Sequence, residues 1–282
     1  MKIKIALAQI NTKLGRPEAN LETHLHYIQQ AKAQQADLVV FPELSLTGYF
    51  LQDLARSVAR RPSREDPIFG PLLESSQEID IVVGFVEEDQ RSRNYISAAY
   101  LSEGKILHTH RKVYLPTYGM FDEGRFFASG DGVQAFNTRF GRFGLLVCED
   151  FWHAPLPYLL WLDGADLMLF ISASPSRGLT SAPQPASSRW VEHINQAYAS
   201  LFTTFVASTN RVGFEDGINF WGGATVHGPD GELVIRGPFQ DEALTFAEID
   251  FSQINHTRTQ LPLLRDEKPE LILNELKRIL RK

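Results

Sequence analysis

Cysteine is almost absent from this sequence, which has a single one, Cys148, in 282 residues. One thiol cannot form a disulfide within the chain. Long apolar runs are absent too: none approaches the roughly 20 residues that cross a bilayer. The opening stretch MKIKIALAQI turns polar too soon to resemble a signal peptide. We therefore expect a protein of the reducing cytoplasm with no membrane partner.

Excess positive charge is also lacking, since the formal net charge is -6. Such a chain offers no basic field for polyphosphate, so nucleic acid is not expected as a partner, and small molecules or proteins are favoured. The composition, with 43% hydrophobic and 22% charged residues, is that of an ordinary globular protein. No repeat or low-complexity block divides it, and we expect a single domain over residues 1–282.

Several familiar catalytic and cofactor motifs are missing. The sequence has no Gly-x-Ser-x-Gly, no phosphate loop ending in Gly-Lys-Ser/Thr and no His-Glu-x-x-His. GDGVQA, residues 130–135, loosely matches a dinucleotide-binding pattern, but it follows no strand and leads into a predicted hairpin. His108 and His110 share one face of a predicted strand without a carboxylate or cysteine partner in the sequence nearby. We predict neither a cofactor nor a metal.

What the sequence does contain is an alternation of apolar β-type runs and helical stretches, which predicts a mixed α/β layered fold. Helices are expected over 17–35, 66–77, 157–163 and 187–200. The segment WGGATVHGPDGELVIRG has the turn residues of a hairpin, which adds antiparallel pairing. The predicted strands cover residues 3–10, 38–41, 79–86, 95–101, 143–148, 167–172, 202–208, 224–226, 233–235 and 243–249.

The C-terminal segment DEKPELILNELKRILRK predicts one more helix. Leu271, Leu273, Leu276, Ile279 and Leu280 recur at roughly helical spacing, and basic residues stand in its last turn, where they suit the helix dipole. We expect this helix to pack its apolar side on the body of the protein.

Three residues with reactive or charged side chains stand where a predicted strand gives way to a loop: Glu43, Lys112 and Cys148. Singly, each has an ordinary explanation, since a loop glutamate, a surface lysine and a packed cysteine are all common. Together they are informative, because open α/β sheets gather ligand sites at strand ends. Glu43 could take the proton of the thiol, and Lys112 could stabilise a thiolate or the oxyanion formed when sulfur adds to a carbonyl.

These segments resemble the nitrilase, or carbon-nitrogen hydrolase, superfamily. The resemblance extends over most of the chain and rests on KIALAQI, FPELSLTGY, RKVYLP, GLLVCED, NRVG and WGGATVHGPDGE. It implies a four-layer αββα sandwich, a Glu43-Lys112-Cys148 triad and a small-molecule amide substrate. It also implies a homodimer or higher homo-oligomer.

Within the superfamily, the motifs are most similar to the glutamine-amidase domain of glutamine-dependent NAD synthetases. The synthetase domain of that family has an ATP-binding Ser-Gly-Gly loop, which this sequence does not contain. Nitrilases typically follow their cysteine with Trp-Glu, whereas Glu149 and Asp150 stand here, so an amide is favoured over a nitrile. Hydrolysis of linear amides is the prediction; the alternatives are an N-carbamoyl hydrolase and an ammonia-donating or regulatory subunit of a synthetase complex.

The resemblance also assigns supporting residues. Glu123 matches a second glutamate that orients the lysine and the substrate amide, and the backbone N–H of Glu149 would help to hold the oxyanion. Tyr118 and Ser174 match positions that line the substrate pocket. From residue chemistry alone, Arg177 or Arg189 could pair with a substrate carboxylate.

Overall fold

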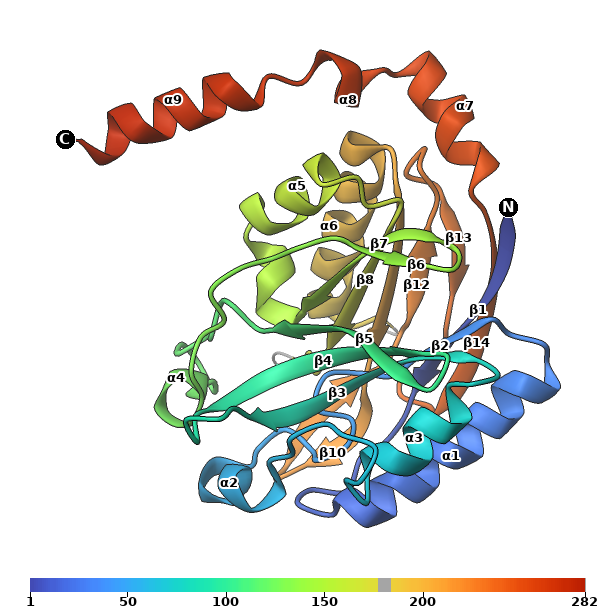
Figure 1. Cartoon of the computed structure of the whole chain (residues 1–282), viewed down its shortest axis with the longest axis vertical. Coiled ribbons are helices and arrows are strands. Elements are labelled where there is room, and N and C mark those ends of the chain that lie inside the picture. The colour runs from blue at the N-terminus through green and yellow to red at the C-terminus, as the bar shows by residue number, and fades with distance from the viewer. Residues whose placement is uncertain (177–183, 282) are drawn as a thin grey trace.

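The computed structural model describes residues 1–176 and 184–281 and consists of two large sheets covered by helices (Figure 1). The first six-stranded sheet has the order β14-β1-β2-β3-β4-β5, and the second has the order β13-β12-β9-β8-β7-β6. In each sheet the central strands are parallel and the outer pairs antiparallel. The first sheet contains β1 (Lys2–Gln9), β2 (Leu38–Val40), β3 (Asp80–Glu88), β4 (Asn94–Ser102), β5 (Lys105–Arg111) and β14 (Ala243–Asp250).

The second sheet and a separate hairpin are built from the remaining strands. The sheet contains β6 (Phe136–Thr138), β7 (Gly141–Val147), β8 (Leu167–Ser172), β9 (Phe205–Asn210), β12 (Thr225–His227) and β13 (Leu233–Arg236). The hairpin pairs β10 (Val212–Glu215) with β11 (Ile218–Trp221).

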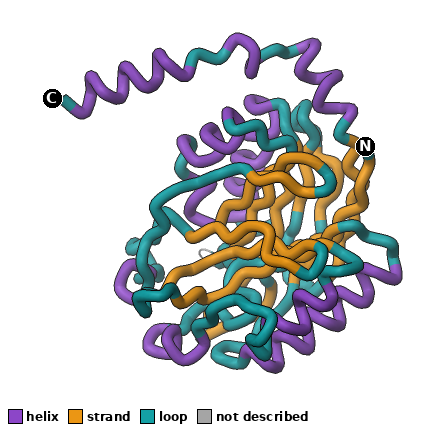
Figure 2. The backbone as a smooth tube through the Cα atoms, in the orientation of Figure 1, coloured by secondary structure: helices purple, strands orange, loops and turns teal. Residues whose placement is uncertain are grey.

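Helices cover the outer face of each sheet. The first sheet carries α1 (Pro17–Ala33) and α3 (Phe69–Ser75), and the second carries α5 (Pro155–Leu162) and α6 (Ala186–Phe202) (Figure 1). The tube view shows the strands gathered between these helical layers (Figure 2). The remaining helical segments are η1 (Gln52–Leu54), α2 (Ala55–Val58), α4 (Glu123–Phe126), η2 (Cys148–Trp152), α7 (Ser252–Gln260), α8 (Leu263–Asp266) and α9 (Pro269–Leu280).

The strand sequences explain this four-layer order. Side chains alternate between the two faces of a strand, and here both faces are apolar. In β1, Ile3 and Ile5 belong to the core between the sheets, whereas Ala6 faces the core under α1 and α3. In β8, Leu169 lies in the core between the sheets and Phe170 in the core under α5 and α6. The αββα sandwich expected from the sequence is confirmed, with the core between the sheets as its centre.

Most predicted elements occur with shifted ends. The strand expected at 202–208 is β9, which begins at Phe205, because α6 continues through Phe202 and ends at Thr203 in a left-handed conformation. Both hairpins suggested by the sequence are present, as β6–β7 and β12–β13. Among the described residues, no helix combines the length and apolar character needed to cross a bilayer.

The expectation that the C-terminal helix packs on the body is wrong. Helix α9 forms, but it projects away from the sandwich, and its residues are exposed (Figure 1). Lys268, which precedes Pro269, has a non-helical backbone with φ -125° and ψ 73°, and a residue before proline is disfavoured in helical conformation. Two non-helical residues, Glu267 and Lys268, therefore separate α8 from α9. The apolar residues of α9 lie outside every core cluster of the described chain.

Candidate active site

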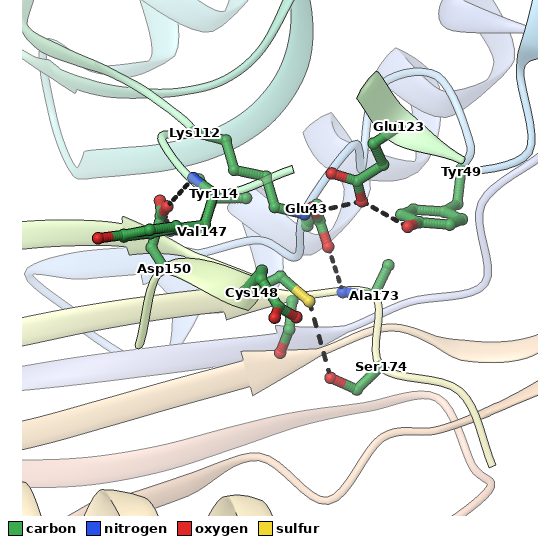
Figure 3. A network of polar contacts seen from close by, with 12 residues as sticks. Glu43, Tyr49, Lys112, Tyr114, Glu123, Val147, Cys148, Asp150, Ala173 and Ser174 are labelled. Carbon is green, nitrogen blue, oxygen red and sulfur yellow. Dashed lines mark hydrogen bonds and ion pairs between the residues drawn. The ribbon is translucent and has the colours of Figure 1, made fainter. Parts of the chain in front are cut away.

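Cys148 is the first residue of η2 and directly follows β7. Its φ of 47° is unusual for a residue other than glycine, and such backbone strain is found most often at functional sites. The side chain is buried, and its Sγ lies 4.0 Å from the Oγ of Ser174, which follows β8 (Figure 3). The thiol thus lies at the carboxyl end of the apolar strand β7 in the second sheet.

Lys112 follows β5 and extends from the first sheet toward Cys148. Its ammonium is completely buried and donates to Glu43 Oε1 at 2.7 Å and to Glu123 Oε1 at 2.8 Å (Figure 3). A buried lysine is tolerated only when its charge is paired, and here two carboxylates pair with it. The sequence predicted that Glu43, Lys112 and Glu123 share a site, and the structure brings them together.

Glu43 is fixed by contacts to both of its oxygens. Oε1 accepts from Lys112, and Oε2 accepts from the backbone N–H of Ala173 at 2.8 Å. The turn that carries Glu43 lies directly against Gly84 in β3, where an added Cβ would come within 2.5 Å of Pro42 O and Leu44 N. A glycine inside the strand sequence IVVGFVE therefore signals this close approach.

Burial and charge set the protonation of these groups. Burial and the nearby Glu43 raise the pKa of the Cys148 thiol well above its ordinary value, although Lys112 acts in the opposite direction. Burial also opposes a charge on Lys112, but Glu123 and Glu43 outweigh it and raise the pKa of the ammonium. Burial raises the pKa of Glu123 to about 7, against the lowering effect of Lys112. The resting site therefore has a neutral thiol beside a charged lysine.

Two further residues hold this arrangement and were not identified from the sequence. Tyr49 donates its hydroxyl to Glu123 Oε1 at 2.5 Å, and its ring lies against Phe121 and Phe220. Asn210 accepts from the backbone N–H of Ser174 at 2.7 Å. Both belong to segments quoted for the resemblance, FPELSLTGY and NRVG, but no local pattern predicts their partners.

A cleft of about 410 Å³ opens beside Cys148. Tyr118, Glu149 and Ser174, three of the expected pocket residues, line it together with aromatic side chains that include Trp152 and Trp190. The hydroxyl of Tyr118 donates to Glu149 Oε2 at 2.9 Å. Glu149 is the one acidic or basic residue on the described part of this lining, so the cleft offers a negative group.

The contact expected of Arg189 with the cleft is not seen. Arg177 lies outside the described residues. Arg189 is exposed on the first turn of α6 and does not belong to the described lining of the cleft.

The two histidines of β5 are placed differently from each other. His110 does have a carboxylate partner, Asp150 Oδ2 at 2.8 Å, contrary to the sequence argument, whereas His108 stacks on Phe136. Within residues 1–176 and 184–281, no group of three or more His, Cys, Asp or Glu is arranged to hold a metal ion. Residues 130–135 form a loop that enters β6, with no helix to receive a pyrophosphate.

Comparison with known proteins shows what this chain is similar to. The family model described as carbon-nitrogen hydrolase matches residues 4–259. A glutamine-dependent NAD(+) synthetase of Acinetobacter baylyi is 33% identical over 89% of this chain, but the match covers 44% of that protein, so the chain spans less than half the length of this relative. An N-carbamoylputrescine amidase of Oryza sativa is 28% identical over 96% of this chain and 93% of its own length. The crystal structure of a carbon-nitrogen hydrolase from Helicobacter pylori matches 99% of both chains with a TM-score of 0.88 and 25% identity.

Proposed function

The chain belongs to the carbon-nitrogen hydrolase family, and on this basis we propose that it hydrolyses the C–N bond of small linear amides through a thioester on Cys148. The observation that carries the proposal is the buried set of Glu43, Lys112 and Cys148: Lys112 is paired with Glu43, and Cys148 lines the cleft. A nucleophile, a base and a cation are what covalent attack on an amide carbonyl requires.

The first half of the reaction forms the acyl-enzyme. Because the thiol is neutral at rest, its proton passes to Glu43 as the sulfur bonds to the carbonyl carbon. The carbonyl π electrons move to oxygen, and this oxyanion is held by Lys112 and by the backbone N–H of Glu149 at the start of η2. When the carbonyl re-forms, the C–N bond breaks, and Glu43 returns the proton to the leaving nitrogen, which departs as ammonia.

The second half consumes water. Glu43 accepts a proton from a water molecule as its oxygen attacks the thioester carbonyl, and the same oxyanion contacts are used again. Collapse of this intermediate breaks the C–S bond, the proton returns to sulfur, and the carboxylic acid leaves. Glu123 has no direct proton-transfer role in this scheme. It holds the ammonium of Lys112 in place.

The cleft also favours a substrate class. Glu149, whose carboxylate accepts from Tyr118 and lies 3.6 Å from Nε2 of His153, belongs to a lining with several aromatic residues and, among its described residues, no lysine or arginine. A substrate whose far end carries an ammonium group would pair with this carboxylate. Both glutamine and N-carbamoylputrescine, which appear in the names of the relatives, carry an amino group. We propose that the substrate is a cationic or zwitterionic compound with a terminal amide.

Hydrolysis of an N-carbamoyl amine is the second candidate. It is favoured by the match to N-carbamoylputrescine amidase, which covers nearly the full length of both proteins. The same thiol attack would occur on the ureido carbonyl and release ammonia, and hydrolysis of the resulting thiocarbamate would give a carbamic acid that breaks down to carbon dioxide and the amine. The ammonia-donating subunit remains the alternative suggested by the similarity to NAD synthetases.

One experiment tests these proposals. Ammonia and carbon dioxide release are measured for a panel of primary amides and N-carbamoyl amines, each with and without an ammonium group. Cys148→Ala should abolish all turnover, and quenched wild-type protein should show an acyl adduct on the Cys148 peptide by mass spectrometry. Turnover by Cys148→Ala contradicts the mechanism. Carbon dioxide from the best substrate selects the N-carbamoyl reaction, and release of ammonia only after addition of a synthetase selects the subunit.

A further inference from the structure

Asp150 lies two residues after Cys148, and its carboxylate is completely buried. One of its oxygens, Oδ1, accepts hydrogen bonds from the backbone N–H group of Val113 at 2.9 Å and from that of Tyr114 at 3.0 Å (Figure 3). These are the two residues that follow Lys112. Asp150 therefore holds the loop on which the ammonium of Lys112 depends.

The other oxygen of the same carboxylate holds the turn that carries the nucleophile. Oδ2 accepts from the backbone N–H of Val147, directly before Cys148, at 3.2 Å. It also accepts from Nε2 of His110, two residues before Lys112, at 2.8 Å. The imidazole of His110 is buried as well.

Four donors from two sheets thus meet on one carboxylate. Val147 belongs to the second sheet, and the other donors follow or belong to β5 at the edge of the first. A buried carboxylate is costly unless its oxygens are hydrogen-bonded, and a carboxylate bound in this way resists movement of any one donor. The strained φ of Cys148 also needs surroundings that keep it in place.

We propose that Asp150, supported by His110, is a positioning residue that fixes the Cys148 thiol relative to the Lys112 ammonium. Asp150 does not belong to the lining of the cleft; its carboxylate acts through the backbone N–H groups of three neighbouring residues and through the imidazole of His110. Its position in the sequence, directly after Glu149, had suggested a role in substrate choice. The structure places it behind the site instead.

The test measures the reactivity of the thiol itself, with iodoacetamide as the probe. Asp150→Asn keeps the shape and one acceptor oxygen but places an amide donor opposite the existing donors. Since small displacements of a reacting pair have large effects on rate, we expect alkylation of Cys148 to slow about tenfold or more. For the best amide of the substrate panel, kcat should fall in parallel. The Kd of that amide, measured on Cys148→Ala with and without Asp150→Asn, should change less than about threefold.

Asp80→Asn is the matched control. Asp80 is an equally buried carboxylate that accepts from Tyr100, Ser102 and Arg139, but it lies at the start of β3, the opposite end of the parallel strands from Glu43. It should lower the melting temperature without slowing alkylation once both proteins are compared below their unfolding transitions. Equal slowing by both variants, or alkylation of folded Asp150→Asn within twofold of wild type, overturns the proposal.

If Asp150→Asn does not fold, alkylation of two His110 variants tests the proposal instead. His110→Leu removes one donor and should slow alkylation, whereas His110→Gln retains an N–H donor and should restore part of the rate. Identical alkylation rates for wild type, His110→Leu and His110→Gln overturn the proposal. Thiol alkylation can be measured even if the protein hydrolyses no amide, so this test does not depend on the proposed function. Only the kcat measurement rests on that function.

Discussion

The hydroxyl of Tyr49 donates a hydrogen bond to Glu123 Oε1, the same oxygen that accepts a hydrogen bond from the ammonium of Lys112. Glu123 Oε1 therefore receives two donors, while Oε2 is buried without a hydrogen-bond partner among the described residues. Both contacts favour the carboxylate over the neutral acid and act against the rise in pKa that burial causes. Tyr49 thus helps to determine the pH at which Glu123 still holds the lysine.

Tyr49→Phe is expected to shift the pH profile. Burial raises the pKa of Glu123 to about 7, and the tyrosine hydroxyl lowers it, so its removal raises this pKa further. The carboxylate form pairs with Lys112, and therefore the acid limb of kcat/KM should move to higher pH. The control is Tyr100→Phe, which removes a buried hydroxyl bound to Asp80 instead. An unchanged acid limb in Tyr49→Phe would show that Glu123 does not titrate in this limb.

Lys112→Met should abolish catalysis and destabilise the protein. Loss of the ammonium removes an oxyanion contact, which costs about 10²–10³-fold or more in kcat. It also leaves Glu43 and Glu123 buried without their partner, which costs about 3–5 kcal/mol at neutral pH.

The stability loss in Lys112→Met should depend on pH. Lys112 lowers the pKa of Glu123, so without it this folded-state pKa rises further above the unfolded value. A raised carboxyl pKa destabilises the fold above that pKa and ceases to do so below the unfolded value of 4.5. Urea unfolding at several pH values should show the deficit shrinking toward acid, and a deficit that grows toward acid contradicts this picture.

Gly84→Ala should displace the turn that carries Glu43. The added Cβ would overlap Pro42 O and Leu44 N, on both sides of Glu43, so the turn must move away from Lys112 and Ala173. We expect a loss of about 1–3 kcal/mol in unfolding free energy and a fall in kcat. Gly132→Ala is the control, because nothing lies within 4 Å of its Cβ position. Full activity in Gly84→Ala would mean that Glu43 tolerates this displacement.

Glu149→Gln tests the cationic substrate. A hydrogen bond to a charged group contributes about 1.5–3 kcal/mol, so kcat/KM for amides with an ammonium group should fall about 10–100-fold. Neutral amides of the same length should lose much less, since the backbone N–H of Glu149 is unchanged. Steady-state kinetics on matched pairs of amides measures the difference. Equal losses on both members of a pair would contradict the pairing with a cation.

The homodimer or higher oligomer expected from the family resemblance remains a prediction. Helix α9 offers a way to test it. Leu271, Leu273, Leu276 and Ile279 are each about half exposed or more, and an apolar surface of this kind is typical of an interface. Removal of residues 269–282 should shift the sedimentation coefficient toward the monomer and leave thermal unfolding of the monomer nearly unchanged. A monomeric wild-type protein at micromolar concentration would contradict the expectation.

The sequence by itself determined the layers and the reactive groups. Apolar β-branched runs specify strands buried on both faces, and the abrupt change from such a run to Glu43 or Cys148 marks a strand end. The triad could be predicted because its three candidate members each follow a strand, and the quoted motifs indicated the family, which is confirmed.

Only the tertiary structure decided what holds those groups in place. Ala173 binds Glu43 from 130 residues away, and Asp150 reaches the lysine loop across 37 residues. Such contacts are absent from any local pattern, because the same aspartate could face the cleft or the interior with an identical sequence around it. The direction of α9 is likewise not set by its own pattern: amphipathic spacing specifies a helix with one apolar side, but whether that side packs on the body depends on the conformation of the residues before Pro269, where α9 begins.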